Sequence, residues 1–421
     1  MKRSRNLTRL WIGLIVVVIL GLSALTYANY RFVQQNPGGN DFLVHWMGTR
    51  VYVTEGISPY SDQAAERIQT YAYGRPAQAG EHELRFAYPL YSIVLFLPFA
   101  LIPDFAMARA IWMTVLEAGL VAISLLSVRV VDWRPGVKTM AAFLLFSLLW
   151  YHGVRPLING NAVILVALCI VGGLLAMRAK ADELAGVLFA FATIKPHVAL
   201  LFILFVAIWS LAHHRPRVVG WLAATVFLLG LSAVLLMPDW ILQNIGEILR
   251  YPAYNPPGTL RTALIALLPG IGNRLGLAIT GVLAVVLIFE WWLSTRTEEY
   301  RHFLWTACLT LVVAQWIGIQ TDPGNFIVTM PAIVLIFTMW EERWHRGGRI
   351  VSLSSMLLLL VTIWGIFLLT VQYGDQPVQS PVMFLPLPAF LLFGLYWVRW
   401  WAIRPPNVWF DSIYVQENRR L

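Results

Sequence analysis

Long apolar segments separated by short polar stretches make up most of this chain. Most of them approach the ~20 residues that a helix needs to cross the hydrocarbon core of a bilayer. The pattern predicts an all-α polytopic membrane protein with about 12 to 13 hydrophobic helices. The segments lie at about residues 10–28, 88–103, 105–128, 138–152, 159–177, 183–194, 196–212, 218–237, 274–293, 302–319, 324–340, 350–371 and 383–402.

The composition supports this class and excludes several others. Of the 421 residues, 58% are hydrophobic and only 13% are charged, which is too apolar for a soluble multidomain protein. The sequence shows no internal repeat, so we expect one membrane domain over residues 1–421. Walker-type loops, HExxH and GxSxG motifs are missing from the sequence. Nucleotide hydrolysis, zinc proteolysis and serine-hydrolase chemistry therefore have no support.

The net charge of +9 comes largely from basic residues in short loops beside the apolar segments. Membrane orientation by the positive-inside rule explains this pattern better than a nucleic-acid partner does. We therefore expect a multi-pass plasma membrane protein with a cytoplasmic N-terminus. The tail from Arg399 and the loops near 129–138, 178–183, 213–217, 294–302 and 341–349 should lie on the same side. The long loop 30–86 is then extracytoplasmic. Counting the crossings leaves segment 88–103, which contains Pro98, either re-entrant or spanning.

The long loop 30–86 contains one predicted helix that begins near Asp41 and stops at Gly56. Asn40 is its expected N-cap. Asp41 and His45 lie one turn apart on a polar face, opposite an apolar face that includes Trp46. The spacing predicts an amphipathic interfacial helix, half in lipid, that presents a carboxylate and an imidazole at the water boundary. The simpler alternative is an amphipathic surface helix without a function.

Further polar side chains gather at the outer ends of the predicted spans. Lys195 is the most informative, because apolar residues flank it on both sides and a charge at that depth needs a partner. Pro196 interrupts the helix and His197 adds a second potential cation, which favours a site for an anionic phosphate. The alternative is that Lys195 snorkels to the interface. The other polar residues of this group are Tyr60, Asp62, Tyr88, Arg155, Asn161 and Arg261.

Five motifs occur in a fixed order along the first half of the chain: Asn40-Asp41-Phe42, Pro59-Tyr60-Ser61-Asp62, Phe86-Ala87-Tyr88-Pro89, Asn159-Gly160-Asn161 and Ile194-Lys195-Pro196-His197. In order and spacing, residues 10–215 resemble family 87 of the glycosyltransferases. These are polyprenol-phosphate-mannose-dependent mannosyltransferase-like proteins of the C-type membrane glycosyltransferase fold. The chain departs from the family pattern at Leu90, where a second proline is usual. It departs again at Ile158-Asn159, where the family has Gly-Gln.

The resemblance implies a role for two residues. Asp41 matches the acidic residue of the first external loop, the candidate catalytic carboxylate, and Lys195 matches the lysine before proline. A sugar on a lipid phosphate already has an anionic leaving group, so cations must hold the phosphate and a base must accept a proton. The predicted phosphate-binding residues are Lys195, His197, Arg155 and Arg261, and the predicted substrate-binding residues are His45, Tyr60, Asp62, Tyr88 and Asn161.

Two of these assignments have alternatives. A helix N-terminus stabilises the charged form of Asp41, which makes it a weaker base. Asp41 is therefore also a candidate ligand for Mg²⁺ or Mn²⁺, or a residue that orients the acceptor. Asn161 has the simpler alternative of a turn and helix cap.

The expected function is that of an integral membrane glycosyltransferase of the cell envelope. It would transfer a hexose, with mannose the sugar that the family implies, from polyprenyl phosphate to an extracytoplasmic glycan or glycolipid, with inversion. The alternative is a lipid-linked saccharide flippase or transporter that uses the same cationic outer pocket without chemistry. Transporters tend to place their polar sites at the midplane between repeats, whereas these residues gather at one face, which favours the enzyme.

Overall fold

The computed structural model describes residues 2–78, 80–255, 258–318, 322–372 and 378–403. Within these ranges the regular elements are helices, apart from one isolated bridge between Gln372 and Val378. The prediction of an all-α protein is confirmed. The predicted cytoplasmic tail after residue 403 lies outside the described residues.

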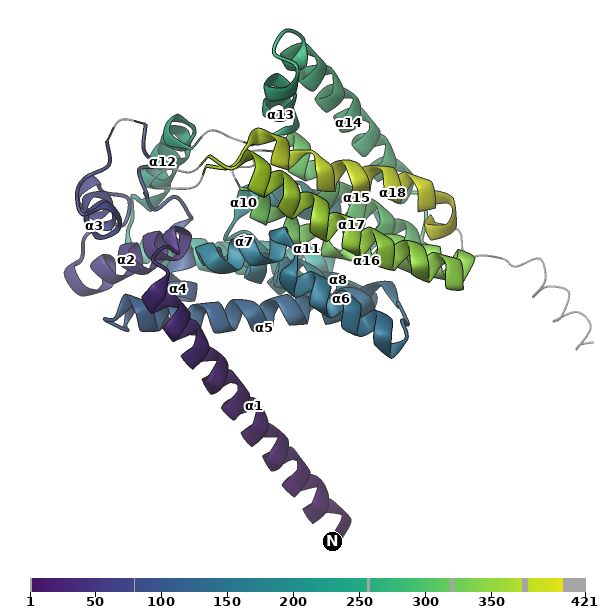
Figure 1. The fold of residues 1–421 in the computed structure, drawn as a ribbon, viewed down its shortest axis with the longest axis horizontal. Helices are drawn as coiled ribbons and strands as arrows, with labels where there is room; N and C mark the ends of the chain where they lie inside the picture. The colour runs from purple at the N-terminus through teal and green to yellow at the C-terminus, as the bar shows by residue number, and fades with distance from the viewer. Residues whose placement is uncertain (1, 79, 256–257, 319–321, 373–377, 404–421) are drawn as a thin grey trace, which may run out of the picture. The chain divides into compact units, whose positions relative to one another are not determined.

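Most helices follow the predicted apolar segments (Figure 1), whereas Asp62–Tyr73, Trp240–Tyr254 and Leu260–Leu267 form helices that the sequence pattern did not predict. In chain order they are α1 (Lys2–Gln35), α2 (Asn40–Glu55), α3 (Asp62–Tyr73), η1 (Leu90–Ser92), α4 (Ile93–Ala100), α5 (Phe105–Val131), α6 (Val137–Leu149), α7 (Tyr151–Asn159), α8 (Val163–Arg178), α9 (Asp182–Ala192), α10 (Pro196–Ala212), α11 (Pro216–Leu236), α12 (Trp240–Tyr254), α13 (Leu260–Leu267), α14 (Gly272–Ser294), α15 (Tyr300–Ile317), η2 (Pro323–Thr329), α16 (Met330–Trp344), α17 (Arg346–Thr370), η3 (Pro381–Phe384) and α18 (Pro386–Ile403).

Among the described residues, seven helices are long and apolar enough to cross a membrane, or eight if the bent pair α6 and α7 forms one span. The polytopic prediction is confirmed. The number of such spans is smaller than the number of predicted helices, because several apolar segments form shorter helices such as α8 and α10. Segment 88–103 is one of these. Its helix α4 has eight residues, so it is about 12 Å long against the ~30 Å hydrocarbon core and does not span alone.

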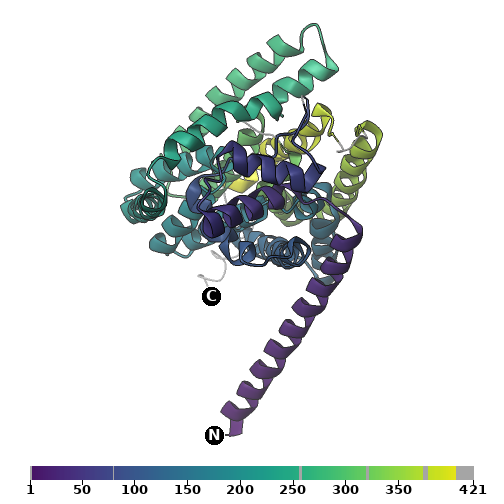
Figure 2. The same ribbon diagram turned by 90° about the vertical axis from the view of Figure 1, so that its left-hand side faces the viewer.

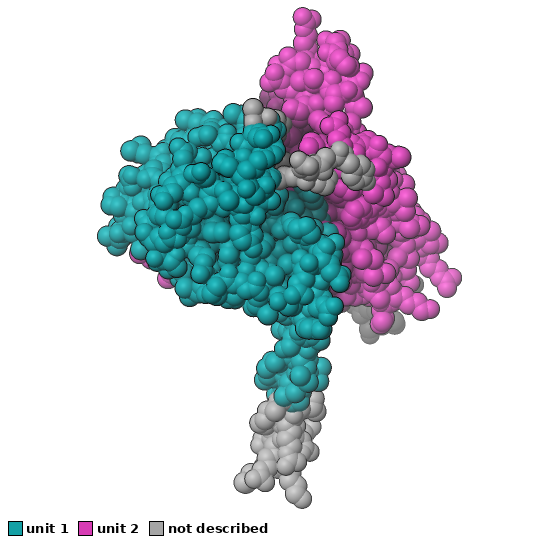
Figure 3. All heavy atoms as spheres, turned by 60° about the vertical axis from the view of Figure 1, so that its left-hand side comes forward, with its two compact units in different colours: residues 1–120, 155–164, 231–255 teal, residues 121–154, 165–230, 256–421 magenta. Residues whose placement is uncertain are grey.

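The described chain divides into two compact units, coloured separately in Figure 3. Unit 1 comprises residues 1–120, 155–164 and 231–255, and unit 2 comprises residues 121–154, 165–230 and 256–421. Each unit therefore collects three separate stretches of chain. The prediction of a single membrane domain stays a prediction.

In unit 1, helix α2 packs against α3 and α4 (Figures 1 and 2). Its N-cap is Gly39, at φ 78°, and not the predicted Asn40, which is the first helical residue. The helix stops at Gly56, whose left-handed conformation lets its N–H bond the carbonyl of Tyr52. Helix α3 begins at Ser61, whose hydroxyl accepts a hydrogen bond from the N–H of Ala64.

Helix α2 differs from the predicted interfacial helix. Phe42 and Trp46 on its apolar face are buried, but so are His45, Gly48 and Thr49 on the other side. Helices α3 and α4 and the aromatic rings around Phe42 cover faces that the sequence pattern leaves to lipid and water. The helix is therefore fixed inside its unit on both sides, which holds Asp41 and His45 in a defined position.

In unit 2, α15 and α16 form the core, with α17 and α18 packed against them. Residues 323–340 of the apolar segment Pro323–Trp344 are all buried, so this stretch contacts protein and not lipid. Helices α13 and α14 form a helical hairpin that is plain in Figure 1. Thr259 and Thr262 begin α13 with a reciprocal capping box.

Candidate functional site

The central pair of the candidate site is Asp41 and Asn161 in unit 1. Asp41 lies half-buried in the first turn of α2, and the Nδ2 of the buried Asn161 donates a 2.9 Å hydrogen bond to its Oδ2. The other end of the Asn161 amide, Oδ1, accepts from the N–H of Val163 at 2.9 Å and so caps the start of α8. The predicted cap is thus present, and its amide nitrogen faces a carboxylate 120 residues away in the chain.

Arg109 holds the two chain segments of this pair together. It lies buried in α5 and donates to the carbonyl oxygen of Asn36 at 3.0 Å and to that of Ile158 at 3.1 Å. The first acceptor lies five residues before Asp41 and the second three residues before Asn161. One guanidinium therefore fixes the approach of both segments.

Two glycines make this close approach possible. Gly39, at φ 78°, lies so near Arg109 that a Cβ would collide with the arginine side chain. Gly160, at φ 70°, faces Phe42, and a Cβ there would meet the Cβ of Phe42 at 2.5 Å. The carbonyl of Gly160 accepts from Nε1 of Trp112 at 2.8 Å, and the Trp112 ring stacks on Phe42 with centroids 5.4 Å apart.

His45 lies one turn after Asp41 and is enclosed by aromatic rings. Its imidazole lies 4.0 Å from the ring centroid of Tyr88 and stacks on Phe96 at 4.6 Å. The predicted substrate-binding residues His45 and Tyr88 are therefore brought together. Arg155, in α7, belongs to the same unit and lies half-buried six residues before Asn161.

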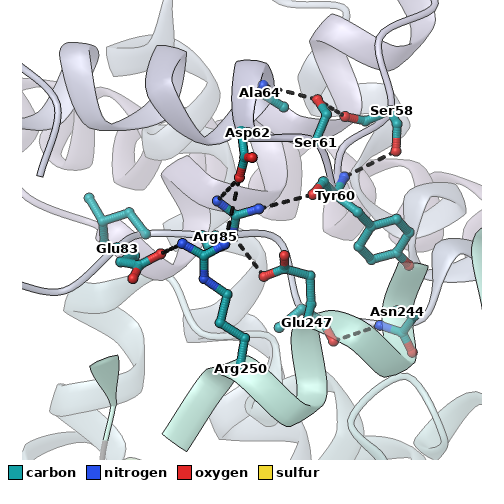
Figure 4. Close-up of polar contacts among 12 residues, drawn as sticks. Ser58, Tyr60, Ser61, Asp62, Ala64, Glu83, Arg85, Asn244, Glu247 and Arg250 are labelled. Carbon is teal, nitrogen blue, oxygen red and sulfur yellow. Dashed lines mark hydrogen bonds and ion pairs between the residues drawn. The ribbon is translucent and has the colours of Figure 1, made fainter. Parts of the chain in front are cut away.

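Tyr60 and Asp62 belong to a polar network centred on Arg85 (Figure 4). Tyr88 is joined to this network through its backbone carbonyl. The buried Arg85 donates from Nε to Glu247 of α12 at 2.8 Å, from one terminal nitrogen to Asp62 at 2.7 Å and from the other to the carbonyl of Tyr60 at 3.1 Å. The hydroxyl of Tyr60 donates to the carbonyl of Tyr88 at 2.7 Å.

The charges and protonation states of this network suit a structural clamp. Burial opposes the charge of Arg85, but the hydrogen bonds to Glu247 and Asp62 outweigh it and raise the pKa of the guanidinium. Burial raises the pKa of the Tyr60 phenol, so the phenol remains a neutral donor. Asp62 thus has a protein partner, although its side chain is 86% exposed. Its role in substrate binding stays a prediction.

The predicted phosphate-binding residues Lys195, His197 and Arg261 belong to unit 2. Lys195 is buried at the start of α10, and its Nζ donates a 2.7 Å hydrogen bond to Oδ1 of the fully buried Asn325 in η2. The ammonium of Lys195 is thus held at depth by an amide. It does not snorkel to the surface, so that alternative is wrong.

The other two predicted phosphate-binding residues of unit 2 differ in their exposure. His197, the second residue of α10, is half-buried and interacts electrostatically with Lys195. Arg261 is exposed on α13 and donates from Nε to Asn273 at 2.6 Å. Whether these unit 2 cations share a site with Asp41 stays a prediction.

Sequence reasoning missed Arg109, and it noted Asn325 among the polar residues at span ends without a role. Arg109 lies in the apolar segment 105–128, where the cost of burying a charge is itself a signal of a structural or functional role. Asn325 follows Asp322-Pro323-Gly324, a polar interruption between two apolar segments, and this motif is visible in the sequence. Their partners are not visible there, because each lies 49 or more residues away.

Asp41 was also predicted as a candidate ligand for a divalent metal ion. Among the described residues, no group of three or more His, Cys, Asp and Glu side chains is placed to hold a metal ion. Asn161 turns its amide nitrogen toward Asp41, so it acts there as a hydrogen-bond donor. A Mg²⁺ or Mn²⁺ ion at Asp41 would need oxygens from the donor phosphate, as is usual for Mg²⁺. The metal role stays a prediction.

The fold and these residues define a polytopic membrane protein with a fixed carboxylate near the start of the chain. Residues 86–253 match the model of glycosyltransferase family 87. The match covers less than half of the chain and confirms the predicted resemblance over that part. The matched part contains Tyr88, Asn161 and Lys195, while Asp41 precedes it and Arg261 follows it. A search of curated proteins and a search of solved structures each found no match.

Proposed function

We propose that this protein is a membrane glycosyltransferase that transfers mannose from polyprenyl phosphate to an extracytoplasmic glycan or glycolipid, with inversion at the anomeric carbon. An acceptor hydroxyl attacks C1 of the sugar, and the bond between C1 and the phosphate oxygen breaks. The polyprenyl phosphate leaves with the electron pair of that bond. The proton of the hydroxyl passes to the carboxylate of Asp41, so the products are a mannoside and polyprenyl phosphate.

The observation that carries this proposal is the contact between Asp41 and Asn161. The amide holds one carboxylate oxygen, Oδ2, at 2.9 Å and so fixes the orientation of the carboxyl group. His45, one turn further along α2, and Tyr88 add an aromatic surface beside it, of the kind on which a sugar ring packs. His45 is buried and Tyr88 is half-buried, which limits their movement beside the base.

Lys195 supports the donor side of the proposal. Its ammonium has three donors, and Asn325 Oδ1 accepts one of them. A phosphate oxygen is a stronger acceptor than an amide oxygen, so a lipid phosphate would replace or extend this contact. His197 and Arg155 are the further cations assigned to the phosphate.

The test is transfer of labelled mannose from polyprenyl phosphate by purified Asp41→Asn protein. Asparagine keeps the size and the acceptor for Asn161 but removes the charge, so the variant should fold and still bind the donor. Loss of general-base assistance should slow transfer about 10²–10⁴-fold. The matched control is Asp104→Asn, an exposed carboxylate that caps the start of α5, which should transfer normally. Near wild-type transfer by folded Asp41→Asn would remove the catalytic assignment.

Two further arms separate the alternatives. Activity of Asp41→Glu that returns only with added Mn²⁺ would favour the metal role over the base. Movement of the labelled lipid across the bilayer without release of polyprenyl phosphate would favour a flippase or transporter instead of an enzyme.

A further inference from the structure

A cavity of about 480 Å³ lies in unit 2, where the segment after α5 meets the end of α16 and the start of α17. Its lining includes Trp133, Arg134, Glu341, His345, Arg346 and Arg349. The volume falls within the ~300–1,000 Å³ that is usual for ligand sites. None of these residues belongs to the candidate site described above.

The local backbone explains why arginines and acids meet here. His345 joins α16 to α17 in a left-handed conformation, at φ 47°, which reverses the chain within one residue. Gly348 then packs against the Trp340 carbonyl so closely that no Cβ would fit. The two helices are therefore in direct contact, and Arg349 of α17 interacts with Glu341 of α16.

The charge balance of the cavity favours an anion. Asp132 lies 3.5 Å from Arg134 and 3.7 Å from Arg178, and Glu342 lies 4.0 Å from Arg301. The three lining arginines, together with Arg178 and Arg301 beside them, are five cations against the three lining acids, which leaves a surplus of positive charge. Guanidinium groups bind phosphate with two parallel hydrogen bonds, so the surplus suits a phosphate group.

The position of the cavity indicates where that phosphate comes from. The helices α5, α16 and α17 are all candidate membrane spans, and the cavity lies at their ends, at the level of lipid head groups. Below Arg346 and Arg349, the same face of α17 exposes Ile350, Leu353 and Leu357, at spacings of three and four residues. A head group in the cavity would place its acyl chains along this apolar stripe.

We infer that this cavity binds the head group of an anionic glycerophospholipid, with its phosphate held by Arg134, Arg346 and Arg349. The charge pattern of the loops predicts that this end is cytoplasmic. The site is separate from the proposed sugar transfer, which is assigned to the extracytoplasmic side. An ordered lipid here would join the ends of α5, α16 and α17 and stabilise their packing.

The test measures lipid binding to the purified full chain by native mass spectrometry, with phosphatidylglycerol and phosphatidylcholine of the same acyl chains. The variant is Arg346→Gln/Arg349→Gln. The matched control, Arg217→Gln/Arg343→Gln, removes two other arginines from loops predicted to be cytoplasmic. We expect the wild type and the control to retain phosphatidylglycerol preferentially, and the variant to bind it at least about tenfold more weakly, as expected for a lost charge-assisted contact.

Other outcomes overturn the inference. Equal retention of phosphatidylglycerol by the variant and the control would show that these arginines do not hold it, and equal retention of phosphatidylcholine would refute selection for an anion. Inorganic phosphate that binds as tightly as the lipid would show that the acyl chains contribute nothing. If the double variant does not fold, Arg134→Gln replaces it, because that side chain is 85% exposed and its loss should not affect folding.

Discussion

Arg109→Met tests whether one buried arginine sets the geometry of the candidate catalytic pair. Arg109 donates to the carbonyls of Asn36 and Ile158 and touches neither Asp41 nor Asn161 through these bonds. Methionine fills a similar volume without a donor. We expect the segments that carry Asp41 and Asn161 to move apart, while the helices themselves remain folded.

The magnitude follows from the two lost hydrogen bonds. A hydrogen bond to a charged group contributes about 1.5–3 kcal/mol, but removal of a buried guanidinium also recovers part of its desolvation cost. We therefore expect a net loss of about 2 kcal/mol in unfolding free energy, which leaves the protein folded. A displacement of about 1 Å at the reacting groups can cost about 10²-fold in rate, so the effect on transfer should be larger than the effect on stability.

The assay compares kcat and KM for sugar transfer with the thermal unfolding midpoint in detergent. Arg109→Met should lower kcat about 100-fold with little change in KM for the donor, since Lys195 and the other predicted phosphate ligands are intact. Arg109→Lys keeps the positive charge and can still make one of the two hydrogen bonds, so it should recover part of kcat. The control is Arg129→Met, an exposed arginine of the same helix. A wild-type kcat in folded Arg109→Met would refute the positioning role.

Three further predictions concern stability and donor use. Burial lowers the pKa of His82 to about 4 from an ordinary 6.5, so its contribution to stability is complete above pH 6.5 and is lost as the pH falls through about 4. At 1.36 kcal/mol per unit of pKa shift, the loss of unfolding free energy approaches about 3 kcal/mol. Between pH 7 and pH 4, the midpoint of thermal unfolding should therefore fall less in His82→Gln than in the wild type. Glu247→Ala leaves the buried Arg85 without its 2.8 Å partner and should destabilise unit 1 by about 3–5 kcal/mol, measured by chemical unfolding; a change below 1 kcal/mol would show that Asp62 alone is enough. Lys195→Ala should weaken donor binding at least about tenfold, measured as KM for polyprenyl-phosphate mannose, whereas the exposed Arg217→Ala should leave it unchanged; equal KM values would leave Lys195 as a structural partner of Asn325.

Local signals in the sequence predicted most of the helices. Gly56 ends α2, as predicted, through the left-handed conformation that glycine adopts easily, whereas α3, which Ser61 caps, was not predicted. The apolar segments became helices because a bilayer requires every backbone group to be bonded within the segment. The helix cap lies at Gly39, one residue before the predicted Asn40, and the reason is tertiary. Gly39 has a left-handed conformation and no Cβ, which leaves room for the Arg109 side chain, and this contact is not visible in the local sequence.

The sequence by itself determined the class of protein, the positions of the apolar helices and the residue types on which the chemistry depends. Hydropathy, capping residues and motif order are properties of the sequence itself, so they can be recognised without knowledge of the fold. The tertiary structure decided which of these residues meet. Asp41 is hydrogen-bonded to Asn161, which lies 120 residues away in the sequence. The corresponding separations are 162 residues for Arg85 and Glu247, and 130 residues for Lys195 and Asn325. It also decided that α2 is covered on both sides, because burial depends on the neighbours that pack on a helix as well as on its own periodicity.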